Sequence, residues 1–336
     1  MTQLAARTTT HLDRRSNPTA DFTLTGAPRS IDDDARRLVD DWLAGRNDRT
    51  RRAYAQSVRD FAAFIGAGSA DEAAAELLRG GHGPANAVAL RYRNHMTDRG
   101  LAPATINSRL AALRSVVALA QRIGLIGWSL SVDGLKAEAY RDTTGPARGT
   151  LAAMLERLKE RAEMLTGKRR AMALRDRAIV HLLHDCGLRR GEVVALNMAD
   201  IDDDRRRVWI VGKGKTQRQA VTLPDSTARA LGDWIDERGA DAGPLLVNFD
   251  PASKGDGRLS GDSIARIVKR AAKAVGAEGV RPHGLRHRGI TTALDVTGGD
   301  VRAVARFSRH ANIQTVVIYD DARLDLGGAV AAKIAL

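Results

Sequence analysis

The run DCGLRRGE at residues 185–192 joins two helical stretches of the chain. A helical pattern extends from about Ala171 to Asp185, and a short helix is expected over residues 192–196. Gly187 and Gly191 favour a turn between these two helices. Arg189 stands in that turn, where it is either a solvated turn residue or a cation with a function.

Downstream of this turn comes the clearest strand signal. Residues 207–211 read RVWIV, residues 212–216 read GKGKT, and residues 219–223 read QAVTL, which together predict a β-hairpin. Helices are expected around it, over about 150–165, 226–237, 262–275, 282–297, 300–308 and 312–320, with Thr150 and Asp262 as N-caps. The predicted fold class is therefore mainly α with a small β-sheet (α+β).

The upstream half of the chain is patterned for helices alone. Tyr54, Val58, Phe61, Ala62 and Ile65 recur with the spacing of one helix face. Further stripes begin near residues 88 and 106, so a bundle of about four helices is predicted. Residues 1–30 are polar and aperiodic, and residues 129–148 are rich in glycine and charge. The expected organisation is a disordered tail (1–30), a helical domain (31–128), a linker (129–148) and a second domain (149–336).

Composition limits the partners and the compartment. Lys and Arg number 53 against 40 Asp and Glu, a net charge of +13. This charge suits a protein that binds an anionic partner such as DNA. On charge alone, a soluble protein that is merely basic fits equally well. Cys186 is the single cysteine, so no intrachain disulfide is possible. No apolar run approaches about 18 residues. A cytoplasmic protein without membrane contact is expected.

Six residues have the side chains that a metal-free attack on a phosphodiester needs. Arginines can hold the non-bridging oxygens, a lysine can protonate the leaving oxygen, and a tyrosine can attack phosphorus. Each has a structural alternative: a hairpin loop for Lys213, a first-turn position for His283 and a core position for Tyr319. The six are Arg189, Lys213, His283, Arg286, His310 and Tyr319.

Four segments resemble the boxes of the tyrosine recombinases, the phage-integrase family. Residues 185–192 are similar to its first arginine box, 211–215 to its hairpin lysine, 282–287 (PHGLRH) to its His-x-x-Arg box, and 308–319 to its last box. The segment 31–125 also resembles the family's core-binding domain. The resemblance covers about residues 31–325, and it implies a core-binding domain followed by a mixed catalytic domain.

The resemblance implies a site-specific DNA recombinase or integrase that forms a 3′-phosphotyrosyl intermediate and a free 5′ hydroxyl. Arg189 and Arg286 would clamp the phosphate. A tyrosine hydroxyl has a pKa near ~10, so His283 would help to remove its proton. Lys213 would act as general acid, and His310 would bond a phosphate oxygen. No cofactor and no metal are expected.

The chain departs from the family pattern at Arg309, because the family often has glycine before its last histidine. We expect this arginine to point outward and to contact DNA. His287 is expected on a helix surface. Of the two hairpin lysines, Lys213 fits the family spacing better than Lys215.

The implied partner is double-stranded DNA carrying two recombination sites, bound by a homotetramer. Accessory proteins, the target sequence and the biological role stay open. One alternative is a type IB-like topoisomerase, and another is a catalytically idle DNA-binding protein of the same fold. Covalent trapping on a nicked site separates the last alternative from an enzyme.

Overall fold

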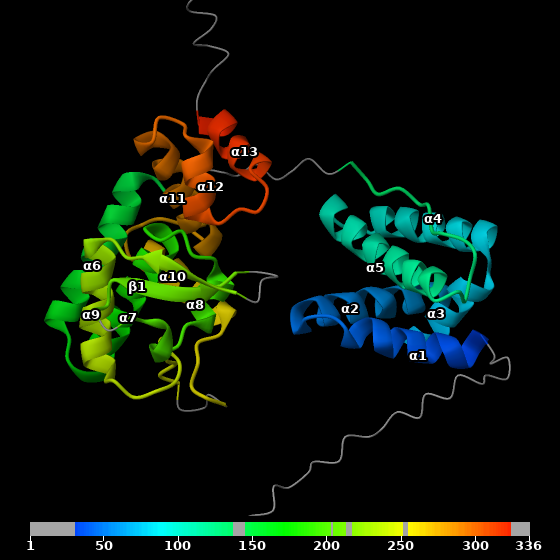
Figure 1. Cartoon of the computed structure of the whole chain (residues 1–336), viewed down its shortest axis with the longest axis horizontal. Coiled ribbons are helices and arrows are strands. Elements are labelled where there is room, and N and C mark those ends of the chain that lie inside the picture. The colour runs from blue at the N-terminus through cyan, green and yellow to red at the C-terminus, as the bar shows by residue number, and fades with distance from the viewer. Residues whose placement is uncertain (1–30, 137–144, 203, 213–216, 251–254, 324–336) are drawn as a thin grey trace, which may run out of the picture. The chain divides into compact units, whose positions relative to one another are not determined.

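The computed structural model describes residues 31–136, 145–202, 204–212, 217–250 and 255–323. The chain divides into two compact units, with the division between Ala139 and Tyr140 (Figure 1). The first unit is helical in its described part, and the second combines helices with a two-stranded sheet. The predicted fold class is thereby confirmed.

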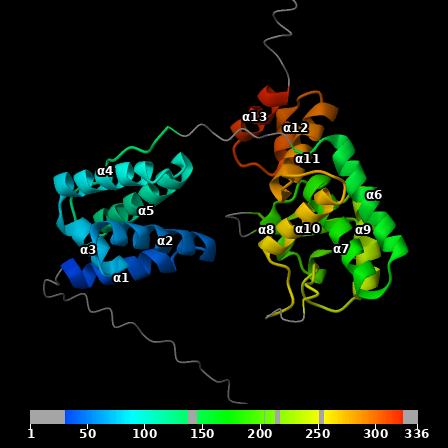
Figure 2. The same cartoon turned by 180° about the vertical axis from the view of Figure 1, so that it is seen from behind.

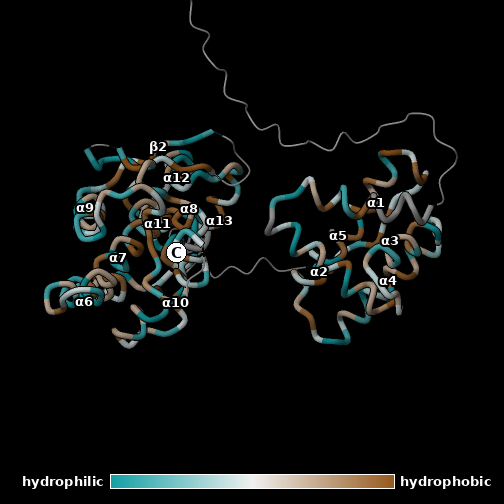
Figure 3. Tube along the Cα trace, turned by 90° about the horizontal axis from the view of Figure 1, so that it is seen from below, coloured by the Kyte–Doolittle hydropathy of each residue, from teal (hydrophilic) through white to brown (hydrophobic). Residues whose placement is uncertain are grey.

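The described part of the first unit holds five helices rather than about four. The additional helix is the short α3, whose buried face is largely Ala73, Ala74 and Ala75 and does not stand out in an alanine-rich sequence. The helices are α1 (Ile31–Ala44), α2 (Asp48–Ile65), α3 (Ala70–Arg79), α4 (His82–Asp98) and α5 (Pro103–Arg122). Figure 3 shows hydrophobic and hydrophilic residues alternating along them, as amphipathic helices require.

The core of this first unit contains aromatic rings from two helices. Phe61 of α2 and Tyr92 of α4 are fully buried, with ring centroids 5.2 Å apart. The Tyr92 hydroxyl donates to Asp60 Oδ2 at 2.7 Å, and Arg109 pairs with the same carboxylate at 2.5 Å. The buried phenol therefore has a charged acceptor, which satisfies its polar end.

The second unit is built around α7. Its elements are α6 (Arg148–Met164), α7 (Gly167–His184), α8 (Arg190–Ala195), the 3₁₀ turn η1 (Met198–Asp200), β1 (Arg207–Val211), β2 (Arg218–Thr222), α9 (Asp225–Arg238), α10 (Gly261–Lys273), α11 (Pro282–Val296), α12 (Val301–Ser308) and α13 (Gln314–Arg323). Strands β1 and β2 pair antiparallel with Val208 opposite Val221, so the predicted hairpin is confirmed. Figure 2 shows the same elements from behind.

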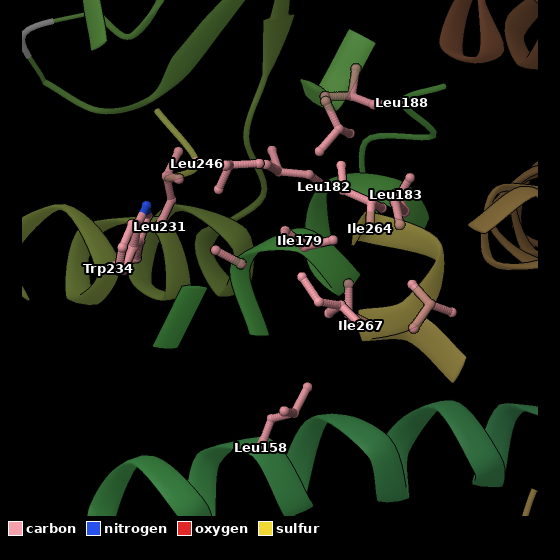
Figure 4. Close-up of a cluster of buried hydrophobic side chains, with 14 of the residues drawn as sticks. Leu158, Ile179, Leu182, Leu183, Leu188, Leu231, Trp234, Leu246, Ile264 and Ile267 are labelled. Carbon is pink, nitrogen blue, oxygen red and sulfur yellow. The ribbon is translucent and has the colours of Figure 1, made fainter. Parts of the chain in front are cut away.

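Helix α7 is buried on most of its surface because its last turns are apolar on several faces. Ile179, Leu182 and Leu183 of α7 lie at the centre of the cluster in Figure 4. The same cluster includes Leu158 of α6, Leu231 and Trp234 of α9, and Ile264 and Ile267 of α10. Burial of this many aliphatic side chains is the main stabilising contribution to the unit.

Helix α11 passes very close to the end of α7. A Cβ added at Gly289 would overlap the backbone carbonyl oxygen of His184, so only glycine allows this approach. A smaller cluster joins α11, α12 and α13 through Ile290, Leu294, Val304, Val316 and Tyr319, all of them buried. These contacts fix the segments that carry the candidate site.

Two predicted N-caps are wrong. Helix α6 begins at Arg148, before Thr150, and its N-cap makes no side-chain hydrogen bond. Helix α10 is capped by Ser260 instead of Asp262, because Ser260 is extended and its hydroxyl accepts from the Ser263 amide at 3.0 Å. No helix within the described ranges is long and apolar enough to span a bilayer.

Candidate active site

Arg189 is held by the first turn of the helix that follows it. It is the N-cap of α8, and Glu192 accepts hydrogen bonds from its backbone amide and from its Nη1, each at 2.8 Å. This is one half of a capping box, in which the side chain of the third helical residue accepts from the N-cap amide, and the guanidinium adds a second donor to the same carboxylate. The Gly187 backbone has a φ of +53°, which lets the chain turn into this position. The Arg189 side chain is left 30% exposed.

Glu192 is a site residue to which the sequence analysis assigned no role. Its side chain is only 4% exposed, and the Nη2 of Arg309 lies 3.5 Å from it. A buried carboxylate requires paired cations. The sequence does contain one indication of this role: Glu192 follows Arg189 by three residues, the spacing of a contact between an N-cap residue and the first helical turn.

Arg286 is almost completely buried on α11, with 1% exposure. Its Nη1 donates to the carbonyl of Gly187, and its Nη2 donates to the carbonyl of Ser308. Burial first, and then the charges of Arg189 and Arg309, lower the pKa of Arg286 to about 10. At neutral pH it remains a cation, and its remaining N–H groups can bind an anion.

His310 follows α12 and lies against Arg286. Its Nε2 is 3.4 Å from Arg286 Nη2, and its Nδ1 is 2.9 Å from the Ser308 hydroxyl oxygen. That hydroxyl already donates to the Val304 carbonyl at 2.7 Å, so Nδ1 of His310 carries the hydrogen and Nε2 is an acceptor. Burial first, and then the charges of Arg286 and Arg189, lower the pKa of His310 to about 4.

Tyr319 of α13 combines a core position with a position beside the cations. Its residue exposure is 6%, and its ring lies 6.2 Å from the His310 ring at an interplanar angle of 26°. Burial raises the pKa of Tyr319, while the charges of Arg286 and Arg189 act in the opposite direction. Deprotonation of this phenol therefore requires a base.

His283 and His287 lie one turn apart on α11 and are in contact. Their Nε2 atoms are 2.6 Å apart. The His287 ring also meets the Tyr319 ring edge-on, with centroids 4.9 Å apart at 90°. The prediction that His287 is a surface residue is wrong, since it is 9% exposed. Its four-residue spacing from His283 places both on one helix face.

The expectation that Arg309 points outward is also wrong. Its side chain is 5% exposed, and its guanidinium donates to the carbonyls of Cys186 at 3.2 Å and Gly187 at 2.7 Å. The Arg309 backbone has a φ of +58°, in the left-handed region where glycine is favoured. The backbone thus keeps the conformation typical of glycine, while the side chain packs against the turn that precedes Arg189.

Five of the six predicted site residues come together in this structure. His310 lies beside both Arg286 and Tyr319, and His283 joins them through His287. Arg189 donates to the backbone carbonyl of Arg309, the residue before His310. The sixth, Lys213, and the alternative Lys215 lie outside the described residues. Among the described residues no group of three or more His, Cys, Asp or Glu side chains is arranged to hold a metal ion.

Comparison with known proteins assigns this arrangement to a family. The model of the phage integrase family matches residues 154–324. The chain belongs to that family. It is 40% identical over 283 residues to a tyrosine recombinase of Synechocystis sp., covering 83% of this chain and 88% of that protein. It is 40% identical over 296 residues to a tyrosine recombinase of Synechococcus elongatus, covering 86% and 90%.

This phage integrase family member is also similar in fold to solved members. The Tn1549 transposon integrase, solved in complex with transposon right end DNA, is 17% identical and matches with a TM-score of 0.60. The match covers 89% of this chain and 98% of that one. Our chain is a tyrosine recombinase, and the resemblance seen in its four sequence boxes is confirmed.

Proposed function

We propose that this tyrosine recombinase cuts and rejoins double-stranded DNA at specific sites, with Tyr319 as the nucleophile. One observation carries the proposal: the buried Tyr319 lies beside the His310 ring, Arg286 contacts His310, and Arg189 donates to the backbone carbonyl of the residue before His310. A phosphate brought to that place would meet the attacking hydroxyl and both guanidinium groups together.

The arginines supply charge where the reaction develops it. Attack on phosphorus concentrates negative charge on the non-bridging oxygens, and fixed guanidinium groups stabilise that charge without reorganisation. Arg189 is held by Glu192, and Arg286 by two backbone carbonyls, so both are preorganised. The charge of Arg189 lowers the pKa of Arg286, and an anion bound beside the two guanidinium groups would offset that repulsion.

Proton transfers complete the proposed step. His283, whose pKa is lowered by burial and then by Arg286 and Arg189, is neutral at pH 7 and can accept the phenolic proton. Lys213 gives a proton to the leaving 5′ oxygen. The phosphorus–5′ oxygen bond breaks as the tyrosine–phosphorus bond forms, which leaves a 3′-phosphotyrosyl link. That link keeps the phosphoester energy, so no ATP is needed for rejoining.

His310 is proposed to bond a phosphate oxygen. In the free chain its Nε2 is an acceptor, so this bond requires a proton on Nε2. A bound phosphodiester anion raises the pKa of a neighbouring imidazole and favours that proton. We therefore propose that His310 becomes charged as the phosphate enters.

Double-stranded DNA is the proposed partner. The net charge of +13 suits a polyanion, and a relative of similar fold was solved with transposon end DNA. Joining two duplexes requires four strand cuts, so we propose that four copies act on two synapsed sites. A protein acting on such DNA would work in the cytoplasm.

The experiment starts without knowledge of the target sequence. The full chain is incubated with randomised duplexes that carry a nick, and DNA that stays attached in detergent is amplified. Two duplexes with the captured sequence are then mixed with the protein and a chelator. Formation of hybrid duplexes supports a recombinase. Relaxation of supercoiled plasmid lacking the sequence, without hybrid duplexes, identifies a topoisomerase, and no attachment identifies an idle DNA-binding protein.

A further inference from the structure

His287 contacts two residues of the proposed active site. Its Nε2 lies 2.6 Å from Nε2 of His283, and the two ring centroids are 3.9 Å apart at 62°. Its ring also meets Tyr319 edge-on. One buried imidazole therefore touches both the proposed base and the proposed nucleophile.

The contact between the two histidines couples their tautomers. Two neutral imidazoles that meet through their Nε2 atoms need a hydrogen on one Nε2 and a lone pair on the other. While this bond exists, Nδ1 is the ring nitrogen of His283 left to accept a proton. The proposed role of His283 as the base requires a bare Nδ1, which places the hydrogen of neutral His283 on Nε2 and makes His283 the donor and His287 the acceptor.

The same bond offsets an electrostatic disadvantage of His283. Arg286 and Arg189 oppose the protonation of His283 in addition to the effect of burial. A hydrogen bond from an imidazolium is about twice as strong as one from a neutral ring. The Nε2–H bond to His287 therefore strengthens when His283 takes up a proton, which stabilises the protonated base.

We propose that His287 is a positioning residue for DNA cleavage, which holds His283 in the tautomer and orientation that accept the Tyr319 proton at Nδ1. The inference rests on the proposed role of His283 in the function above. The proton moves from the Tyr319 hydroxyl to Nδ1, the phenolic oxygen bonds to phosphorus, and the displaced 5′ oxygen takes its proton from Lys213. His287 keeps its own proton and accepts one hydrogen bond throughout.

The test compares substitutions that differ in where they place an acceptor. His287→Gln puts an amide near the position of Nε2, whereas His287→Asn puts it near Nδ1 and His287→Phe keeps only the ring against Tyr319. Single-turnover adduct formation is measured on the captured nicked duplex, with urea unfolding of each full-length variant. Thr292→Val, on the same helix α11, is the matched control and should leave the rate unchanged.

We expect His287→Asn and His287→Phe to slow adduct formation by about 10–100-fold, the range found when a partner that orients a metal-binding histidine is removed. His287→Gln should recover most of that rate. Combined with His283→Ala, His287→Phe should add no further loss, because its effect passes through His283.

Equal losses in the Gln and Asn variants, or an additive loss in the double variant, would overturn the positioning role. If His287→Phe does not fold, the comparison of Gln with Asn decides in the same way. A wild-type chain that forms no adduct at all would contradict the proposed function itself, which is a different outcome.

Discussion

The Nη2 atom of Arg189 donates to the backbone carbonyl of Arg309, 3.2 Å away, across 120 positions of sequence. This bond ties the turn before α8 to the end of α12. Glu192 lies beside both guanidinium groups, as the buried carboxylate paired with them. Arg286 adds a further buried cation, so the site carries excess positive charge suited to a phosphate.

Removal of the charge of Glu192 should destabilise the chain. Glu192→Gln leaves Arg189 and Arg309 without their carboxylate, and loss of one partner in a buried pair costs about 3–5 kcal/mol. The matched control is Glu160→Gln, which breaks an exposed pair with Arg157 and should cost about 1 kcal/mol or less. Urea denaturation of the two variants measures the difference. Equal losses would show that Glu192 does not neutralise the arginines.

Substitution of Arg309 separates backbone strain from side-chain contacts. Arg309→Ala loses the bonds to Cys186 and Gly187 and keeps the left-handed backbone, whereas Arg309→Gly loses the same bonds and relieves the strain. Both should be less stable than wild type, with Gly about 1 kcal/mol more stable than Ala. An Arg309→Gly chain more stable than wild type would show that the strain outweighs the contacts.

The close approach of α11 to α7 makes Gly289 sensitive to a single methyl group. Gly289→Ala should lower the free energy of unfolding by well over about 1 kcal/mol. The added Cβ would meet the His184 carbonyl and displace the helix that carries Arg286. Gly232→Ala in α9 is the control, because its Cβ would meet the Arg205 guanidinium at an ordinary 3.6 Å. Similar melting temperatures for both variants would contradict the close packing.

The sequence predicted the elements of the second unit well, because each hydrophobic stripe and the hairpin are local patterns. It also selected five residues that the fold brings together. It misjudged Arg309 and His287, whose burial depends on α7, α8, α12 and α13 packing around them. Contacts between distant segments leave no periodic signal in either segment. Glu192 was overlooked because a buried carboxylate and a solvated one look alike in sequence.

The lowered pKa of His310 predicts a specific pH dependence of stability. The unfolded chain, with a histidine pKa near 6.5, binds this proton more readily than the folded chain, whose His310 pKa is about 4. The stability contributed by neutral His310 is therefore complete above about pH 6.5 and is lost as the pH falls towards about 4.

The measurement compares wild type with His310→Asn, which can still donate to the Ser308 hydroxyl but does not titrate. The difference in the free energy of unfolding between the two should be smaller at about pH 5 than at about pH 7.5, because only wild type loses stability through His310. A difference that stays constant, or grows at the lower pH, would contradict the burial of a neutral His310.

The most direct test of the account is the chemical identity of the protein–DNA link. Wild type and Tyr319→Phe are incubated with the captured nicked duplex, denatured, and digested to peptides for mass spectrometry. We expect wild type to yield a DNA 3′-phosphate attached to the peptide containing Tyr319. Tyr319→Phe should bind the duplex with similar affinity and yield no attached peptide. An adduct that persists in Tyr319→Phe, or that maps to another residue in wild type, would contradict the central claim.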